Sequence, residues 1–139
     1  MYYNEESVIY YNGKFIKAKE ASENPYSQSL HYGNGVFEGI RAYNTPNGTR
    51  IFKSEQHYKR LKYGAEVMGI QFNYTADELT KITYELLERN GLKDAYIRPL
   101  ITTGADMSLA TSNKTNLIIQ CWEWGKYMGD KLLRVKTSS

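Results

Sequence analysis

Cysteine, histidine and proline are scarce in this chain of 139 residues, which has one cysteine, two histidines and three prolines. The single cysteine, Cys121, excludes an intrachain disulfide and suits a reducing compartment. It lies in an apolar, strand-like run, so we expect an inert, buried thiol. With only His31 and His57 beside it, the sequence has no spacing typical of metal ligands, and we predict no metal site.

Long apolar runs and clustered charge are lacking as well. No apolar stretch approaches the roughly 20 residues of a membrane-spanning helix. The segment from Met1 to Glu6 has neither the basic nor the apolar region of a signal peptide. The 18 basic residues are scattered and the net charge is only +3, whereas nucleic-acid binding needs a basic patch. We therefore expect a cytoplasmic protein that binds neither membrane nor nucleic acid.

The chain does contain enough apolar residues for one core and an unusual number of tyrosines. Hydrophobic residues make up 41% of the sequence, and 13 residues are tyrosine. Tyrosine combines a large flat surface with a polar tip, which suits pockets and interfaces. A chain of this length is expected to form a single domain.

Runs of β-prone residues alternate with two amphipathic stretches. Strand pairs followed by two helices and more strands predict an α+β fold, a two-layer sandwich of a mostly antiparallel sheet with two helices packed on one side. We expect strands at 8–11, 14–17, 36–43, 49–53, 95–102 and 116–123, helices at 55–68 and from 75 to about 90, and the start of a further strand at 132–136.

Local signals mark several of these boundaries. Asn12-Gly13 tolerates positive φ at both positions and predicts a tight hairpin. Ser54 is the expected N-cap of the first helix, and Thr75 to Glu78 forms a capping box for the second. Pro99 cannot donate a hydrogen bond to a neighbouring strand, so we expect it at a sheet edge or a bulge.

The stretch Leu30–Tyr43 organises the rest of the chain. It opens with a glycine-spaced turn and continues as a strand. At period two, one face of that strand carries an aromatic side chain, a gap at Gly39 and a fixed positive charge. A glycine inside a strand indicates either a bulge or the close approach of a ligand or another backbone, and the strand alone leaves both open. The first face holds Phe37, Gly39, Arg41 and Tyr43, and the second holds Val36, Glu38, Ile40 and Ala42.

Four sequence blocks, kept in one order along nearly the whole chain, resemble a known family. They are Leu30-His31-Tyr32-Gly33 with Val36-Phe37-Glu38-Gly39-Ile40-Arg41; His57 with Arg60-Leu61; Ala95-Tyr96-Ile97-Arg98-Pro99-Leu100; and Trp124-Gly125 with Tyr127 and Gly129. Together they resemble the small N-terminal domain of the branched-chain-amino-acid aminotransferases, which belong to the fold type IV class of pyridoxal-phosphate enzymes. The resemblance implies transfer of an amino group from leucine, isoleucine or valine to 2-oxoglutarate, with pyridoxal 5'-phosphate as the cofactor.

The same resemblance implies roles for particular residues. Arg60 matches the arginine that holds the cofactor phosphate, and a guanidinium suits that task because it stays charged and can bind phosphate through two nitrogens. Tyr96 and Arg98 match the pair that reads the substrate carboxylate. Tyr32, Phe37, Trp124 and Tyr127 match walls of the pocket for the aliphatic side chain. Gly39 would let substrate or cofactor approach, Arg41 would anchor the strand near Tyr32 or assist a side-chain carboxylate, and Met107 and Leu109 match a loop that reaches a neighbouring subunit's site.

The resemblance covers only a small domain. In this family the lysine that forms a Schiff base lies in a large domain, beyond a Ser-Ser segment that Ser138-Ser139 reproduces. We therefore assign no catalytic residue to this chain, and we expect a fragment that is inactive alone. Residues 1–130 are the expected small domain, and 131–139 the linker or the start of the missing large domain. The expected partners are amino acid and 2-oxo acid substrates, that large domain, and a second subunit in at least a dimer.

Other functions stay open at this point. A D-amino acid aminotransferase or an aminodeoxychorismate lyase has the same fold type, although Glu38-Gly39-Ile40-Arg41 together with Tyr96-Ile97-Arg98-Pro99 favours the branched-chain group. An RNA-binding module that stacks bases on a tyrosine-rich sheet is a second possibility. A purely structural interaction domain is the third, and it would leave the matches at Arg60, Tyr96 and Arg98 without a function.

Overall fold

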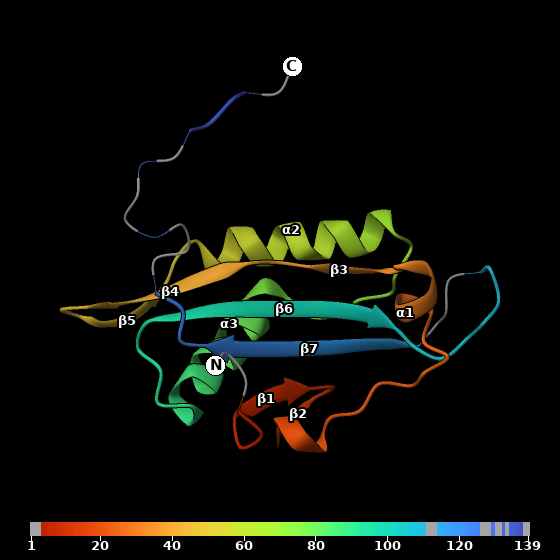
Figure 1. Cartoon of the computed structure of the whole chain (residues 1–139), viewed down its shortest axis with the longest axis horizontal. Helices are drawn as coiled ribbons and strands as arrows, with labels where there is room; N and C mark the ends of the chain where they lie inside the picture. Colours follow the sequence, from red (N-terminus) through yellow and green to blue (C-terminus); the bar gives the residue numbers. More distant parts are fainter. Residues whose placement is uncertain (1–3, 111–113, 126–128, 130–131, 133, 138–139) are drawn as a thin grey trace.

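The computed structural model describes the chain except residues 1–3, 111–113, 126–128, 130–131, 133 and 138–139. The described residues form a seven-stranded antiparallel sheet in the order β2-β1-β7-β6-β4-β5, with β3 also paired to β6 (Figure 1). The elements are β1 (Val8–Tyr11), β2 (Lys14–Lys17), the 3-10 helix η1 (Ala18–Glu20), α1 (Gln28–Tyr32), β3 (Gly35–Phe37), β4 (Ile40–Thr45), β5 (Gly48–Ile51), α2 (Ser54–Val67), α3 (Ala76–Arg89), β6 (Ala95–Thr103) and β7 (Thr115–Trp122).

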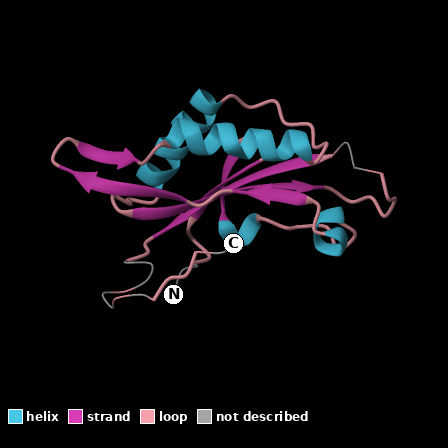
Figure 2. Cartoon of the chain, turned by 90° about the horizontal axis from the view of Figure 1, so that it is seen from above, coloured by secondary structure: helices cyan, strands magenta, loops and turns pink. Residues whose placement is uncertain are grey.

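The two long helices, α2 and α3, cover one side of this sheet (Figure 2). The core lies between them and the sheet, where side chains from both layers are fully buried. This arrangement confirms the predicted α+β sandwich. The short helix α1 was not predicted, and it lies at one end of the sheet (Figure 1). Among the described residues, no helix combines the length and the apolar character needed to cross a bilayer.

The predicted local signals are confirmed at the first hairpin and at α3. Asn12 and Gly13 have φ values of 46° and 88°, as a tight turn of this type requires. At α3, the Thr75 hydroxyl oxygen accepts a hydrogen bond from the Glu78 backbone N–H at 3.2 Å, and the Glu78 carboxylate accepts one from the Thr75 N–H at 2.7 Å. This capping box fixes the start of the helix.

Ser54 is not the N-cap of α2, contrary to the sequence prediction. The helix already includes Ser54, and its N-cap is Lys53, which has φ 47° in the left-handed region. The Ser54 hydroxyl lies 2.6 Å from the hydroxyl of Thr80 on α3. The side chain of Ser54, which local sequence predicted to cap the helix, therefore makes a tertiary contact between the two helices instead.

The buried faces of both helices match the predicted stripes in most positions. Tyr58, Leu61 and Ala65 of α2 are buried, but Met68, which follows the last helical residue, is 42% exposed. On α3 the core also includes a polar residue that the apolar pattern missed. This is Thr83, whose hydroxyl bonds both the Leu79 carbonyl and the Tyr58 hydroxyl.

Pro99 lies within the sheet, not at an edge or a bulge. The registers of β3 and β4 against β6 are continuous and place Glu38 opposite Pro99. The Glu38 N–H donates to the Pro99 carbonyl at 3.0 Å, but Pro99 has no N–H with which to return the bond. This interruption separates β3 from β4, while on its other side β6 keeps an eight-residue pairing with β7.

The strand expected at 132–136 is not formed by the described residues of that segment. Leu132 and Val135 are almost fully exposed, and residues 134–137 lie away from the sheet (Figure 1). A strand needs a neighbour to satisfy its backbone hydrogen bonds, and no described strand lies beside this segment.

Candidate functional site

The sheet has one face against α2 and α3 and one face free of them (Figure 2). The alternation predicted for the organising stretch is confirmed: Ile40 and Ala42 are fully buried on the helix side, as is Ile97 of β6. The residues between them point to the other side. We call this side the aromatic face and define it by Phe37, Arg41, Tyr96, Arg98, Trp122 and Trp124.

Arg98 is held in place on the aromatic face by two neighbours. Its Nε and Nη2 atoms donate hydrogen bonds to the Tyr96 hydroxyl oxygen at 3.2 and 2.8 Å. Its guanidinium carbon also lies 4.5 Å from the centre of the Phe37 ring, within cation–π range. These contacts orient the guanidinium, and no described residue bonds its third nitrogen, Nη1, which can meet a ligand anion.

The gap at Gly39 is real, but a side chain of this protein fills it. A Cβ atom at this position would lie 2.5 Å from the Tyr96 hydroxyl oxygen. Glycine is therefore required so that the Tyr96 hydroxyl can pack against the strand where Arg98 reaches it. The close approach of Tyr96 thus accounts for the glycine within this chain, and the expected approach of substrate or cofactor at Gly39 stays a prediction.

Two tryptophans extend the aromatic face across β6 and β7. Strand pairing aligns Arg41, Tyr96 and Trp122 in one row, and the Tyr96 ring lies 4.9 Å from Trp122 and 5.0 Å from Trp124, centre to centre. Arg41 Nη1 donates to the Trp124 carbonyl at 2.6 Å, so Arg41 holds Trp124. Its expected roles, anchoring the strand near Tyr32 or assisting a side-chain carboxylate, stay predictions. Trp122 was not predicted, although its alternation with buried Cys121 would have placed it here.

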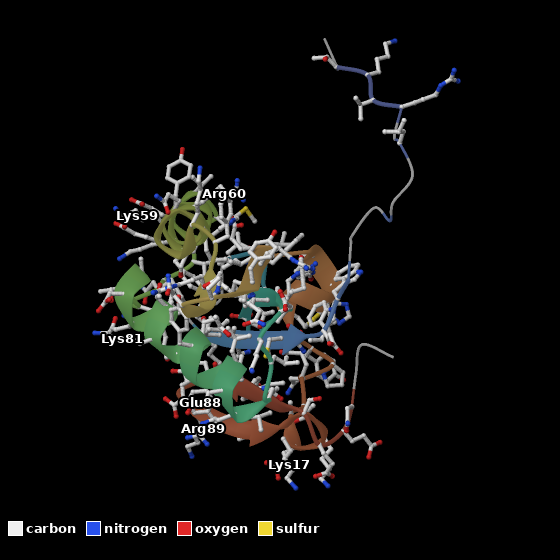
Figure 3. The ribbon with its side chains drawn as sticks, turned by 90° about the vertical axis from the view of Figure 1, so that its left-hand side faces the viewer. Lys17, Lys59, Arg60, Lys81, Glu88 and Arg89 are labelled. Carbon is white, nitrogen blue, oxygen red and sulfur yellow. The ribbon has the colours of Figure 1, made fainter. Side chains whose placement is uncertain are left out.

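Arg60 lies on α2 and is labelled on that helix in Figure 3. Its partner Glu38 points to the face of the strand opposite Phe37, which contacts Arg98. The Glu38 carboxylate accepts hydrogen bonds from Arg60 Nε and, at 2.7 Å, from Arg60 Nη2. His57 Nδ1 lies 2.9 Å from the same carboxylate. Burial raises the pKa of Glu38, but the hydrogen bonds from Arg60 and His57 outweigh it and leave that pKa below the ordinary value of 4.5. An ionised carboxylate only accepts, so His57 Nδ1 carries the proton of this bond.

The remaining predicted residues lie near α1, at the end of the sheet. Tyr32 donates its hydroxyl to the Met107 carbonyl at 3.3 Å. Leu109 is 93% exposed and lines, with Tyr32, a hollow of about 380 Å³. Gln28, which the sequence analysis missed, is buried and ties α1 to the carbonyls of Ser108 and Ala110 at 3.0 and 2.6 Å. Tyr127 falls outside the described residues.

This arrangement suits a small anion with an apolar part. Arg98 offers an oriented guanidinium between an aromatic ring and a phenol, and Trp124 adds apolar surface beside it. Arg60 can hold a second anion, because Glu38 occupies Nε and Nη2, no described residue bonds Nη1, and the Arg60 side chain is 69% exposed. Phosphate is a ligand that a guanidinium binds well, so the residues present fit a phosphorylated cofactor.

Comparison with known proteins gives a consistent match. The model of the amino-transferase class IV family matches residues 35–139. The branched-chain-amino-acid aminotransferase of Pseudomonas aeruginosa is 41% identical over 140 residues, which cover 96% of this chain and 46% of the relative. The chain thus spans about half the length of the curated relatives it matches.

Solved structures agree with the sequence match. The crystal structure of the branched-chain amino acid aminotransferase of Escherichia coli superposes with a TM-score of 0.85 at 34% identity, covering 90% of this chain and 42% of that one. The "T.th." branched-chain amino acid aminotransferase complexed with N-(5'-phosphopyridoxyl)-L-glutamate gives a TM-score of 0.78 at 37% identity, covering 86% of this chain and 41% of that one.

Proposed function

This chain belongs to the amino-transferase class IV family, and we propose that it is the N-terminal part of a pyridoxal-phosphate-dependent branched-chain-amino-acid aminotransferase. The reaction would exchange the amino group of leucine, isoleucine or valine with 2-oxoglutarate. We propose residues 1–130 as the small domain and 131–139 as the link to the large domain, which would carry the Schiff-base lysine. The small domain alone is then inactive.

One observation carries the assignment of the substrate site: Arg98 is fixed between the Tyr96 hydroxyl and the Phe37 ring. We infer that Arg98 and Tyr96 bind the substrate carboxylate, since an oriented guanidinium with a remaining nitrogen favours that group. Phe37 and Trp124 would contact the aliphatic side chain, because aromatic walls bury apolar surface without demanding hydrogen bonds. Arg41 contributes by holding Trp124 in position.

We assign the cofactor phosphate to Arg60. When bound, pyridoxal phosphate supplies the electron sink for exchange of the amino group. The task of Arg60 is to bind and orient the phosphate, and Glu38 holds two of its nitrogens while a third remains. The phosphopyridoxyl compound in the complex of the "T.th." relative supports this choice of cofactor.

Tyr32, Met107 and Leu109 lie together at the α1 end of the sheet, and we propose that they serve a substrate site across a subunit interface. Apolar side chains that are exposed together, as Tyr32, Met107 and Leu109 are, are typical of surfaces that another chain covers. The proposed protein is at least a dimer. We place it in the cytoplasm, which accords with the single, buried cysteine.

The test is the substrate profile of the full-length protein that contains this sequence. We expect glutamate formation from 2-oxoglutarate with leucine, isoleucine and valine. Activity confined to D-alanine, or to aminodeoxychorismate, would assign the protein to one of the other fold type IV activities. A salt-sensitive complex with RNA, in the absence of any transamination, would favour the binding-module alternative.

Arg98→Lys tests the carboxylate assignment directly. Lysine keeps the charge but loses the planar set of donors, and we expect the KM for leucine to rise about tenfold or more, since a hydrogen bond to a charged group contributes about 1.5 kcal/mol or more. Arg89→Lys, on the exposed side of α3, is the matched control and should leave the KM unchanged. An unchanged KM in Arg98→Lys would contradict the assignment.

A further inference from the structure

Glu38 occupies an unusual place for a carboxylate. It is 5% exposed and lies where β3 ends and β4 has not begun, on the side of the strand that faces α2. Its two oxygens accept hydrogen bonds from two side chains of that helix, Arg60 and His57. A buried carboxylate is costly unless it is paired, so such a group requires a reason beyond packing.

The contacts between Glu38 and Arg60 fix the orientation of the guanidinium as well as pairing its charge. Glu38 meets the Nε and Nη2 edge of the guanidinium, and two parallel bonds to one planar group define its orientation. The Arg60 side chain is otherwise 69% exposed and is free to adopt other rotamers without this partner. His57, with only 20% of its side chain exposed, holds the second carboxylate oxygen from the preceding turn of α2.

The backbone of Glu38 is also tied to the aromatic face. Its N–H is bonded to the Pro99 carbonyl, and its two chain neighbours face the other side of the sheet. There Phe37 packs on the Arg98 guanidinium, and Gly39 accommodates the Tyr96 hydroxyl. The three residues 37–39 therefore reach both arginines, one from each side of the strand.

We propose that Glu38 is a positioning residue that orients Arg60 toward the cofactor phosphate. Through the same strand it also fixes the position of Arg60 relative to Arg98 on the other face. This inference rests on the proposed function, because it takes Arg60 as the phosphate ligand. It assigns a role to a side chain that would contact neither substrate nor cofactor. Its conservative replacement is Glu38→Gln, which keeps the shape of the side chain and removes its charge.

The orientation of Arg60 can be measured on the chain of 139 residues without any cofactor. In the nitrogen-15 NMR spectrum, we expect the Arg60 Nε–H signal to exchange slowly with water, and to exchange fast in Glu38→Gln. Glu85→Gln is the matched control, because Glu85 also pairs with Nε and Nη2 of an arginine, Arg89 of α3, although through one carboxylate oxygen. It should release Arg89 and leave Arg60 protected. An Arg60 signal that stays protected in Glu38→Gln would overturn the inference.

The consequence for the cofactor is measured in the full-length protein with two probes. For pyridoxal 5'-phosphate we expect Glu38→Gln to raise the Kd about tenfold, the scale at which loss of an orienting partner weakens a site. For pyridoxal, which lacks the phosphate, we expect no change. A merely structural role would weaken both probes alike or neither, and either result would overturn the inference. Glu85→Gln should bind both probes as the unmodified protein does.

Two further variants complete the design. Arg60→Lys should lose affinity for pyridoxal 5'-phosphate, and adding Glu38→Gln to it should cost nothing more, because the two residues would act as one unit. Where Glu38→Gln does not fold, Glu38→Asp replaces it, since the shorter carboxylate keeps the charge and loses the two-bond geometry. Failure of the unmodified full-length protein to bind pyridoxal 5'-phosphate would instead overturn the proposed function, while the NMR result would stand independently.

Discussion

Three arginines near the strand break at residues 38–39 are each fixed by a different kind of partner. Arg98 is held by a phenol and an aromatic ring, Arg60 by a carboxylate, and Arg41 by the Trp124 carbonyl. A guanidinium has five N–H donors in a rigid plane, so partners that occupy one edge orient the others. At the scale of single residues, the site is therefore a set of cations whose directions are set before any ligand arrives.

Gly39→Ala tests the packing of Tyr96 against the strand, on which the orientation of Arg98 depends. The added methyl would overlap the Tyr96 hydroxyl, which is the end of a side chain that can swing away. We expect the fold to survive, with an unfolding temperature close to that of the parent, and the KM for leucine to rise in the full-length protein because Arg98 loses its partner. Gly125→Ala, whose Cβ would meet open space, is the control. Equal kinetics for the two variants would contradict this account.

Glu38 also predicts a dependence of stability on pH. Its pKa is lower in the folded protein than the ordinary value of 4.5, so the unfolded chain binds a proton more readily. Its contribution to stability is complete above pH 4.5 and is lost as the pH falls through the lowered pKa. We expect Glu38→Gln to be less stable at pH 7 and to lose less of its stability between pH 5 and pH 3, as measured by urea unfolding.

The comparison variant for this pH series is again Glu85→Gln. Glu85 and Arg89 are both about half exposed, and pairs of that kind contribute little to stability. This variant should follow the pH dependence of the parent. Parallel curves for the parent and Glu38→Gln across the whole range would show that the pairing of Glu38 with Arg60 and His57 has no energetic consequence.

Elements begin and end for different reasons in this protein. The start of α3 is set locally, by a capping box within four residues, whereas the start of α2 is set by Lys53 in a left-handed conformation and by a hydroxyl contact with α3. The division of β3 from β4 is caused by a residue on another strand, Pro99. Only the first of these boundaries is set by side chains adjacent in the sequence alone.

Thr75→Ala tests the locally set start of α3. Removing the hydroxyl leaves the Glu78 N–H at the helix start without its partner, so we expect a loss of about 1 kcal/mol in the free energy of unfolding. Thr75→Ser keeps the oxygen and should retain most of the stability. Urea unfolding followed by circular dichroism measures both. A loss in Thr75→Ser as large as that in Thr75→Ala would show that the capping oxygen is not the cause.

The whole molecule is built as a sheet with one face covered and one face that presents its aromatic side chains. On that face Phe37 is 61% exposed, and Tyr96, Trp122 and Trp124 are only partly buried. A contiguous aromatic surface of this kind favours association. The chain spans less than half of each related structure, and we propose that in the whole protein the large domain faces this side.

We therefore expect the chain of 139 residues to self-associate as its concentration rises, as measured by sedimentation velocity. Phe37→Ser should weaken that association about tenfold, because burying a phenylalanine stabilises by roughly 1.5–3 kcal/mol. Tyr63→Ser, which removes an equally exposed aromatic side chain on α2, should have no such effect. A strictly monomeric chain at high concentration would contradict the prediction.

The sequence alone determined the features that repeat locally. Period-two alternation put Phe37 and Arg41 on one side of the strand and Ile40 on the other, and helical spacing identified most of the buried faces of α2 and α3. The Asn12-Gly13 turn and the Thr75 capping box were equally accessible, because backbone preferences act over a few residues. The resemblance of ordered blocks led to the family.

Tertiary structure alone decided which side chains meet. The Tyr96 hydroxyl fills the gap at Gly39, and Arg41 holds Trp124. Pro99 is tolerated inside the sheet. Each of these contacts depends on segments far apart in the sequence. Arg60 and Glu38 are 22 residues apart, and nothing in either segment indicates the other. Local sequence limits the conformation of a segment, whereas its partners are chosen by how all the segments pack together.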